Sequence, residues 1–271
     1  MKTRILAAAV LIPVLLLVVL VAPKWVAAVI FAALLAIAAY ELLFRTGLVK
    51  HPRLVLYSCV MAAAVAMWSY FDAENAYAAL GIPVFVMILF AEMMSDHVKV
   101  RFESICMCMV AGILIPYLLS AIIRILTLKT GRYLIITPFV VAFCADAGAY
   151  FAGMRFGKHK LAPVVSPNKT VEGVLGGLVC ATLGMVIYTA VLQFAFRFQV
   201  NYALAVLYGM LGTVVDVMGD LCFSVIKRQT GIKDYGNLIP GHGGVLDRFD
   251  SLVTVAPVME ALIALFPFAV G

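Results

Sequence analysis

The feature that most constrains this 271-residue chain is a succession of long apolar stretches separated by short polar connectors. A helix needs about 20 mostly apolar residues to cross the hydrocarbon core of a bilayer. About nine stretches meet this requirement, at residues 5–22, 25–44, 53–71, 76–94, 104–126, 133–153, 171–196, 201–226 and 249–270. The pattern therefore predicts an all-α, polytopic integral membrane protein with about nine transmembrane helices.

The composition excludes a soluble globular protein. Hydrophobic residues make up 65% of the chain and charged residues only 13%, and the mean hydropathy is +1.10. No connector is long enough to form a separate soluble domain, so we expect one membrane domain over residues 1–271. Within it, we assign residues 1–130 to scaffold or oligomerisation helices and residues 131–271 to catalytic helices and cytoplasmic loops.

The first apolar stretch has two interpretations. It follows the basic start "MKTR", as in a secretory signal peptide, but it continues to Ala22 and ends at Pro23-Lys24 without a small-residue cleavage site. These features favour a retained first helix over a cleaved signal peptide.

The distribution of positive charge predicts the orientation. With the N-terminus in the cytoplasm, fifteen of the twenty Lys and Arg residues fall on cytoplasmic connectors, as do all four His residues. This asymmetry favours a cytoplasmic N-terminus. The positive charge on one membrane face is explained without any substrate by topology and by attraction to anionic lipid headgroups. The more specific alternative is a binding site for polyanionic substrates.

Acids within the apolar stretches distinguish the two halves of the chain. Glu41 and Glu92 lie near expected cytoplasmic helix ends, and we interpret both as boundary residues. From about residue 138 onward, five acids fall inside the stretches, namely Asp146, Glu172, Asp216, Asp220 and Glu260. A charge deep in a bilayer costs roughly 3 kcal/mol or more, so it normally faces protein, water or a metal. Chemistry is therefore expected in the second half.

The segment "SPNKTVEG", residues 166–173, combines helix-capping and basic residues. Ser166 or Thr170 can cap a helix that begins near Val171, which leaves amide donors and the positive dipole end facing the cytoplasm. Lys169 beside such an end predicts a phosphate-binding position. The alternative is an ordinary capped helix after a proline turn.

The segment "DVMGDLCFSVIKR", residues 216–228, places polar residues on one helical face. Asp216, Asp220 and Ser224 are spaced four residues apart, and Lys227 follows about 10 Å beyond Asp220 along the axis. Carboxylates with a cation at the membrane surface suit a metal bound to a phosphate. Equally, Asp220 can simply pair with a basic residue on a neighbouring helix.

The stretch "SVIKRQTGIKDYGNLIPGHGGVLDRFDS", residues 224–251, is the most distinctive connector. Its glycines at 241, 243 and 244 allow the backbone to approach a ligand closely. Acids at the start of the last helix complement its dipole, but Arg248 between Asp247 and Asp250 does not follow from capping. Two aspartates from different helices would form an oxygen site suited to Mg²⁺, whose shell usually includes substrate phosphates.

This stretch resembles the signature of the phosphatidate cytidylyltransferases, also called CDP-diacylglycerol synthases. The matching positions are Ser224, Lys227, Arg228, Lys233, Asp234, Gly236, Pro240, His242, Gly243, Gly244, Asp247, Arg248 and Asp250. "SPNKTVEG" and "DAGAYFAG" look like further motifs of this family, and the resemblance covers about residues 138–255. Two positions differ: Phe223 stands where Glu is common, and Asp216 lies outside the pattern, so we do not expect it to be a ligand.

The resemblance implies transfer of the cytidylyl group of CTP to phosphatidic acid, giving CDP-diacylglycerol and pyrophosphate, by a homodimer. The short N-terminus before the first apolar stretch favours a bacterial cytoplasmic membrane over an organelle membrane. It implies Mg²⁺ bound by Asp220 and Asp247, with K⁺ as a second ion, and we add Asp146 as a candidate ligand. The expected catalytic residues are Lys227, Arg228, Lys233, Asp234, His242 and Arg248. The expected substrate-binding residues are Ser166, Asn168, Lys169, Thr170, Glu172, Ser224, Gly243, Gly244 and Asp250.

Two rival functions stay open at this point. A CTP-dependent lipid kinase would release CDP instead of pyrophosphate, and a transporter would use the buried acids as a cation relay. No nucleic-acid partner is expected.

Overall fold

The computed structural model describes residues 13, 17–71, 76–238, 241 and 243–271, without the side chains of residues 76–79. Six helices within this part are long and apolar enough to cross a membrane: Lys24–Arg45, Pro52–Phe71, Phe102–Thr127, Gly131–Phe156, Val171–Phe196 and Tyr202–Gln229. The protein is therefore helical and suited to a bilayer, as the apolar pattern predicts. Most of the predicted stretch 5–22 lies outside the described residues, and His242 does as well.

The chain forms two compact units, and we describe each by itself. The first unit comprises residues 1–127 together with Gln229–Phe249, and the second comprises Leu128–Arg228 together with Asp250–Gly271. The boundary at residues 127 and 128 lies beside the expected division at residue 130. The connector after residue 228, however, groups with the N-terminal helices.

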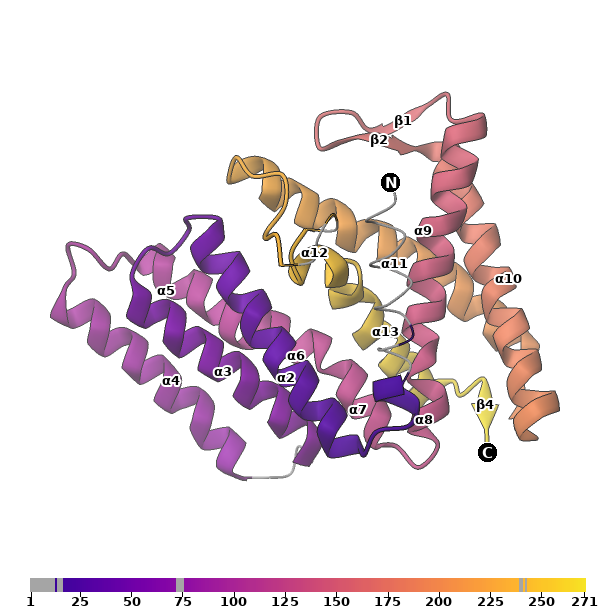
Figure 1. Ribbon diagram of the computed structural model, residues 1–271, viewed down its shortest axis with the longest axis horizontal. Coiled ribbons are helices and arrows are strands. Elements are labelled where there is room, and N and C mark those ends of the chain that lie inside the picture. Colours follow the sequence, from indigo (N-terminus) through magenta and orange to yellow (C-terminus); the bar gives the residue numbers. More distant parts are fainter. Residues whose placement is uncertain (1–12, 14–16, 72–75, 239–240, 242) are drawn as a thin grey trace. The chain divides into compact units, whose positions relative to one another are not determined.

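The first unit consists of helices, two of which contain wide π-helical turns. Its elements are α2 (Lys24–Tyr40), η1 (Glu41–Arg45), α3 (Pro52–Phe71), α4 (Ala76–Ser95), α5 (Phe102–Met109), η2 (Val110–Leu114), α6 (Ile115–Leu119), α7 (Ala121–Thr127) and α12 (Leu246–Phe249) (Figure 1). Helices α2 and α3 pack together along much of their length. Their buried faces contain small residues, among them Ala28, Ala32 and Ala62, which allow close approach of two helices in a membrane protein.

Helix α12 joins this unit through an aromatic contact. The rings of Phe31 in α2 and Phe249 in α12 lie edge to face with centroids 6.4 Å apart. This contact holds the C-terminal end of the signature connector against the first helices of the unit.

The described part of the second unit contains three long helices, two shorter ones and two small sheets. Its elements are α8 (Gly131–Leu134), α9 (Ile136–Phe156), β1 (Lys160–Ala162), β2 (Ser166–Thr170), α10 (Val171–Phe196), β3 (Gln199–Val200), α11 (Tyr202–Gln229), α13 (Leu252–Leu265) and β4 (Ala269–Val270). Strands β1 and β2 form an antiparallel hairpin between α9 and α10, and β3 pairs antiparallel with β4.

Helices α9 and α10 form the closest helix pair of the second unit and lie side by side in Figure 1. A Cβ atom on Gly177 would lie 2.8 Å from the carbonyl oxygen of Ala145, and one on Gly148 would lie 2.5 Å from that of Gly176. Larger residues would force the two helices apart. The Gly173-x-x-x-Gly177 pattern is thus a packing surface in this structure.

The last predicted stretch, 249–270, differs from a single continuous helix. Helix α12 ends at Phe249, α13 runs from Leu252 to Leu265, and β4 follows. The residue before a proline disfavours the helical conformation, and Phe266 precedes Pro267. Phe266 accordingly leaves the helix with φ −137° and ψ 67°.

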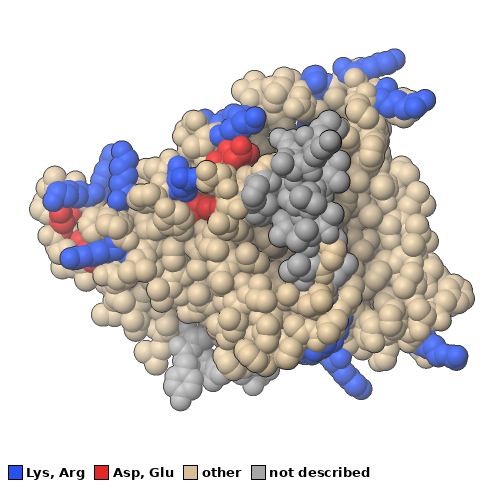
Figure 2. Space-filling model, viewed as in Figure 1, with Lys and Arg blue, Asp and Glu red and all other residues tan. Residues whose placement is uncertain are grey.

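The surface agrees with a membrane location. On the face that Figure 2 shows, residues other than Lys, Arg, Asp and Glu cover most of the surface. Large apolar side chains are exposed along α10, among them Leu175, Val179, Leu183 and Ile187. A helix that presents apolar side chains outward along its length has the surface that a lipid environment requires.

Candidate active site

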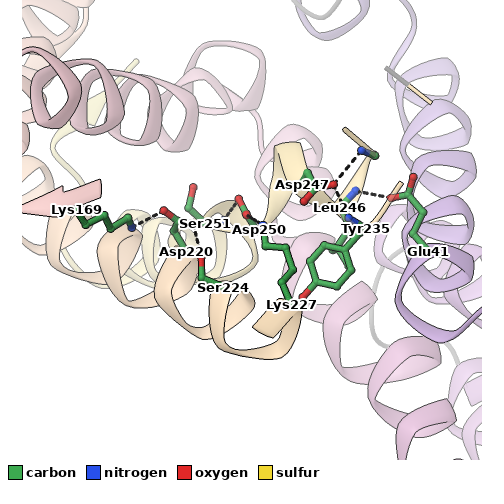
Figure 3. A network of polar contacts seen from close by, with 11 residues as sticks. Glu41, Lys169, Asp220, Ser224, Lys227, Tyr235, Leu246, Asp247, Asp250 and Ser251 are labelled. Carbon is green, nitrogen blue, oxygen red and sulfur yellow. Dashed lines mark hydrogen bonds and ion pairs between the residues drawn. The ribbon is translucent and has the colours of Figure 1, made fainter. Parts of the chain in front are cut away.

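An ion pair joins strand β2 to helix α11 in the second unit. The Lys169 ammonium at the end of β2 contacts the Asp220 carboxylate of α11, and both side chains are about three-quarters buried (Figure 3). Ser224 Oγ donates a hydrogen bond to Asp220 Oδ1 at 3.3 Å. The structure thus brings the predicted phosphate-binding lysine and the predicted metal-binding aspartate into contact. The alternative interpretation of Asp220 expected a basic partner on a neighbouring helix, whereas Lys169 lies in strand β2.

Thr170 caps helix α10. Its Oγ1 accepts a hydrogen bond from the Gly173 amide at 3.1 Å, while Ser166 lies at the start of β2 and pairs in register with Ala162. The cap prediction is therefore confirmed for Thr170. The Val171 amide donates to the carbonyl oxygen of His159 at 2.9 Å, so two amides of this first turn already have acceptors. The positive end of the helix dipole still lies beside Lys169, which favours an anion at this position.

Glu172 fastens the β1–β2 hairpin to the first turn of α10. Its carboxylate accepts hydrogen bonds from the Lys158 amide at 3.1 Å and the His159 amide at 3.2 Å, and it contacts His159 Nδ1 at 2.5 Å. The contacts give Glu172 a role in shaping the hairpin, whereas its predicted role in substrate binding stays a prediction.

Two cations at the C-terminal end of α11 are held by neighbouring segments of the second unit. Lys227 Nζ lies 3.5 Å from Asp250 Oδ2, with both side chains largely buried. Arg228 Nε donates to the carbonyl oxygen of Val165 in the hairpin at 3.2 Å. The ends of α10, α11 and α13 and the hairpin therefore gather at one end of the second unit.

A cavity of about 200 Å³ opens next to this cluster, within the second unit. Its polar lining includes Asp146, Asn168, Lys169, Thr170, Thr213 and Asp216. Asp216 is 2% exposed, and its Oδ1 has no hydrogen-bond partner among the described residues. The cavity thus joins the capped end of α10 to two carboxylates in the middle of apolar helices.

The signature connector in the first unit is ordered around Asp247. This residue is 6% exposed, and its Oδ2 accepts hydrogen bonds from the amides of Tyr235 at 2.7 Å and Gly244 at 2.9 Å. Gly243 has φ +87°, and a Cβ atom there would lie 2.7 Å from Asp247 Oδ2. Gly243 was expected to allow a ligand to approach the backbone closely. In the structure it is the Asp247 carboxylate that approaches the backbone at Gly243.

The other predicted residues of this connector differ in their exposure. Lys233, Asp234 and Arg248 are exposed, and Gly244 is buried. Their positions leave the charged groups available to an incoming substrate. The prediction for His242 falls outside the described residues.

Sequence reasoning missed Glu41, which it assigned to a helix boundary. The Glu41 carboxylate is 3% exposed and accepts hydrogen bonds from the backbone amides of Val245 at 3.1 Å and Leu246 at 2.8 Å (Figure 3). No local pattern connects residue 41 to a loop about two hundred residues later. An acid between apolar residues at the end of a helix was the sole available signal.

The carboxylates fit a magnesium ion that shares its shell with substrate, but not a closed protein cage. No group of three or more His, Cys, Asp or Glu side chains with metal-binding geometry occurs within the described residues. Mg²⁺ is usually bound by one or two carboxylates plus waters and substrate phosphates, so the donor chemistry of Asp220 and Asp247 is suitable. These two residues belong to different units.

Comparison with known proteins decides the family. The model of the cytidylyltransferase family matches residues 2–266 of the chain. The chain belongs to the cytidylyltransferase family. Among its relatives is the phosphatidate cytidylyltransferase of Bacillus subtilis, which is 34% identical over 274 residues and 98% of each chain.

Two staphylococcal relatives of this cytidylyltransferase-family chain align over shorter stretches. The phosphatidate cytidylyltransferase of Staphylococcus haemolyticus is 36% identical over 179 residues, or 66% of each chain. That of Staphylococcus saprophyticus is 41% identical over 137 residues, or 51% of each chain. The chain thus spans about half to two-thirds of these two relatives, and nearly all of the Bacillus relative.

Proposed function

We propose that this chain transfers the cytidylyl group of CTP to phosphatidic acid, giving CDP-diacylglycerol and pyrophosphate in phospholipid biosynthesis. The observation that carries the proposal is the similarity to the Bacillus subtilis phosphatidate cytidylyltransferase along 98% of both chains. The family match over residues 2–266 supports the same nucleotidyl transfer. The clustered basic and acidic side chains of the second unit supply suitable chemistry.

The reaction needs charge neutralisation more than proton transfer. An oxygen of the lipid phosphate attacks the α-phosphorus of CTP, the new P–O bond forms, and the bond between the α-phosphorus and the bridging oxygen breaks to release pyrophosphate. The attacking oxygen is already anionic, so no strong general base is required. Positioning and electrostatic stabilisation by fixed cations therefore provide the rate enhancement.

Lys169 is the residue that we assign to substrate phosphate at the start of α10. Its ion pair with Asp220 keeps the ammonium oriented beside the capped helix end. When a phosphate binds there, the ammonium turns from Asp220 to the phosphate, and the helix amides add their positive dipole. Asn168 and Thr170 line the adjoining cavity and complete this subsite.

Lys227, Arg228, Lys233 and Arg248 are assigned to the negative charge that gathers on pyrophosphate and the lipid phosphate. Lys227 is pre-oriented by Asp250 and Arg228 by the Val165 carbonyl group. Pre-oriented cations lose little entropy when they bind phosphate, and Arg binds it with a planar fork of donors. Asp234, Ser224 and His242 keep supporting roles in this proposal.

Magnesium is assigned to Asp220 and Asp247, where it would neutralise triphosphate charge and polarise the α-phosphate. Asp146 is a further candidate ligand, and K⁺ a candidate second ion. Asp247 is already held by the amides of Tyr235 and Gly244, which limits the orientations of its carboxylate. Removal of Mg²⁺ with EDTA should stop turnover, and added Mg²⁺ should restore it.

The proposal includes a topology of nine spans with a cytoplasmic N-terminus, in a bacterial cytoplasmic membrane, as a homodimer. The excess of Lys and Arg on the expected cytoplasmic connectors supports this orientation. The acyl chains of phosphatidic acid then stay in lipid while its headgroup meets cytoplasmic CTP at the polar end of the second unit.

The test uses purified protein with phosphatidic acid, Mg²⁺ and CTP labelled at either the α- or the γ-phosphate. Cytidylyl transfer moves the α-label into lipid and the γ-label into pyrophosphate. A lipid kinase would instead place the γ-label on lipid and release CDP, which would contradict the proposal. Movement of substrate across sealed vesicles without consumption of CTP would favour a transporter.

A further inference from the structure

The Glu41 carboxylate is buried at the point where α2 changes into the wide turn η1. Each carboxylate oxygen accepts one hydrogen bond: Oε1 from the Val245 amide and Oε2 from the Leu246 amide. Single π-helical turns within α-helices occur frequently at functional sites. Here the turn begins with the residue that reaches the signature connector.

The connector is shaped around this carboxylate. A Cβ atom on Gly244 would lie 2.5 Å from the Glu41 carboxyl carbon, and one on Gly236 would lie 2.9 Å from it. Neither glycine has a positive φ angle, so backbone conformation alone does not require glycine there. The close approach of the Glu41 side chain is what excludes larger residues.

Glu41 and Asp247 both accept hydrogen bonds from backbone amides of the signature connector, at different residues. Glu41 accepts the amides of residues 245 and 246, and Asp247 accepts those of residues 235 and 244. A carboxylate that receives two amide hydrogen bonds makes charge-assisted interactions, which are about twice as strong as neutral ones. The backbone on both sides of Gly244 is consequently fixed by buried carboxylates.

A second contact joins η1 to the connector. Arg45 Nη2 donates to Asn237 Oδ1 at 2.6 Å. The turn thus contacts the connector before Gly241 and after Gly244. An exposed contact of this kind adds little stability but restricts the loop's position.

We propose that Glu41 is a positioning residue for cytidylyl transfer, which orients Asp247 by holding the amides of Val245 and Leu246. The inference rests on the proposed function, because it takes Asp247 as a ligand of the magnesium–nucleotide complex. Residues that orient metal ligands typically change metal affinity or activity about 10- to 100-fold when replaced. Glu41 acts through the loop and does not touch the reacting atoms.

The first experiment replaces one carboxylate oxygen with an amide group. Glu41→Gln keeps the size of the side chain but turns an NH2 group toward one of the two loop amides. We expect kcat to fall about tenfold or more and the Mg²⁺ concentration for half-maximal activity to rise about tenfold, with KM for phosphatidic acid within about twofold of wild type. Glu92→Gln is the matched control, because Glu92 belongs to the same unit and contacts Tyr57 and Arg53.

A second readout follows the loop directly. Hydrogen exchange of peptides containing Val245 and Leu246 should be faster in Glu41→Gln and unchanged in Glu92→Gln. If the Mg²⁺ requirement and this exchange both equal those of wild type, Glu41 does not position the loop and the proposal is wrong. A uniform loss of folded protein without a shift in Mg²⁺ requirement in the folded fraction would also contradict it.

Gly244→Ala tests the same contact from the loop side and does not remove the buried carboxylate. The added methyl group pushes against Glu41, so the Mg²⁺ requirement and the exchange of residues 245 and 246 should both rise. Wild-type values for both would overturn the proposal even if Glu41→Gln fails to fold.

Asp247→Asn, measured in parallel, separates this inference from the proposed function. Near-normal turnover in Asp247→Asn would contradict the metal role of Asp247. Loss of turnover in Asp247→Asn with an unchanged Mg²⁺ requirement in Glu41→Gln would contradict the positioning role alone.

Discussion

Lys169, at the end of β2, forms an ion pair with Asp220 in the middle of the polar face of α11. The pair joins the two segments that the sequence marks for phosphate and metal binding. It also explains how both charges are tolerated when they are largely buried, since a buried charge is stable only when it is paired.

Replacement of Lys169 by Met should remove both the partner of Asp220 and the proposed phosphate ligand. We expect kcat/KM for CTP to fall about 100-fold, as for loss of one preorganised donor to transition-state charge. Lys160→Met, at an exposed position of β1, is the control and should retain activity. Equal activity of the two variants would exclude Lys169 from substrate binding.

Thr170→Ala should destabilise the protein through loss of the α10 cap. The expected decrease in the free energy of unfolding is about 1 kcal/mol, because the Gly173 amide loses its partner. Thermal unfolding in detergent measures the effect as a lower Tm. Ser166→Ala should leave Tm almost unchanged, since Ser166 does not cap the helix; a larger drop for Ser166→Ala would refute this assignment.

Gly243→Ala should abolish most activity, whereas Gly231→Ala should not. Both glycines have positive φ angles, +87° and +70°, so alanine strains the backbone similarly at each. Only at Gly243 would the new Cβ atom meet the Asp247 carboxylate, while Gly231 has nothing within 4 Å. Comparable turnover numbers for the two variants would show that displacement of Asp247 is harmless.

Local features of the fold could be predicted from the sequence, because neighbouring residues determine them. The apolar stretches give the long helices, and Thr170 caps α10 because its side chain reaches an amide three residues later. The short β1–β2 hairpin was not predicted, since it depends on Glu172 contacts with the backbone at residues 158 and 159.

Tertiary features of the candidate site could be predicted only in part. The spacing of Asp220 and Ser224 indicates a shared face, but it does not reveal Lys169 as the partner of Asp220. The contacts of Glu41 could not be predicted, because a hydrogen bond between residues 41 and 246 leaves no periodic signal in the sequence. The functional hypothesis came from the resemblance to the cytidylyltransferases, because the spacing of the polar residues alone left several interpretations open.

The most direct test of the central claim measures Mn²⁺, as a paramagnetic substitute for Mg²⁺, bound to the purified protein with a non-hydrolysable CTP analogue. Electron paramagnetic resonance should detect bound Mn²⁺ in the wild type and Asp216→Asn, and at least about tenfold weaker binding in Asp220→Asn and Asp247→Asn. Undiminished Mn²⁺ affinity in either of the last two variants would contradict a metal–nucleotide site shared by Asp220 and Asp247.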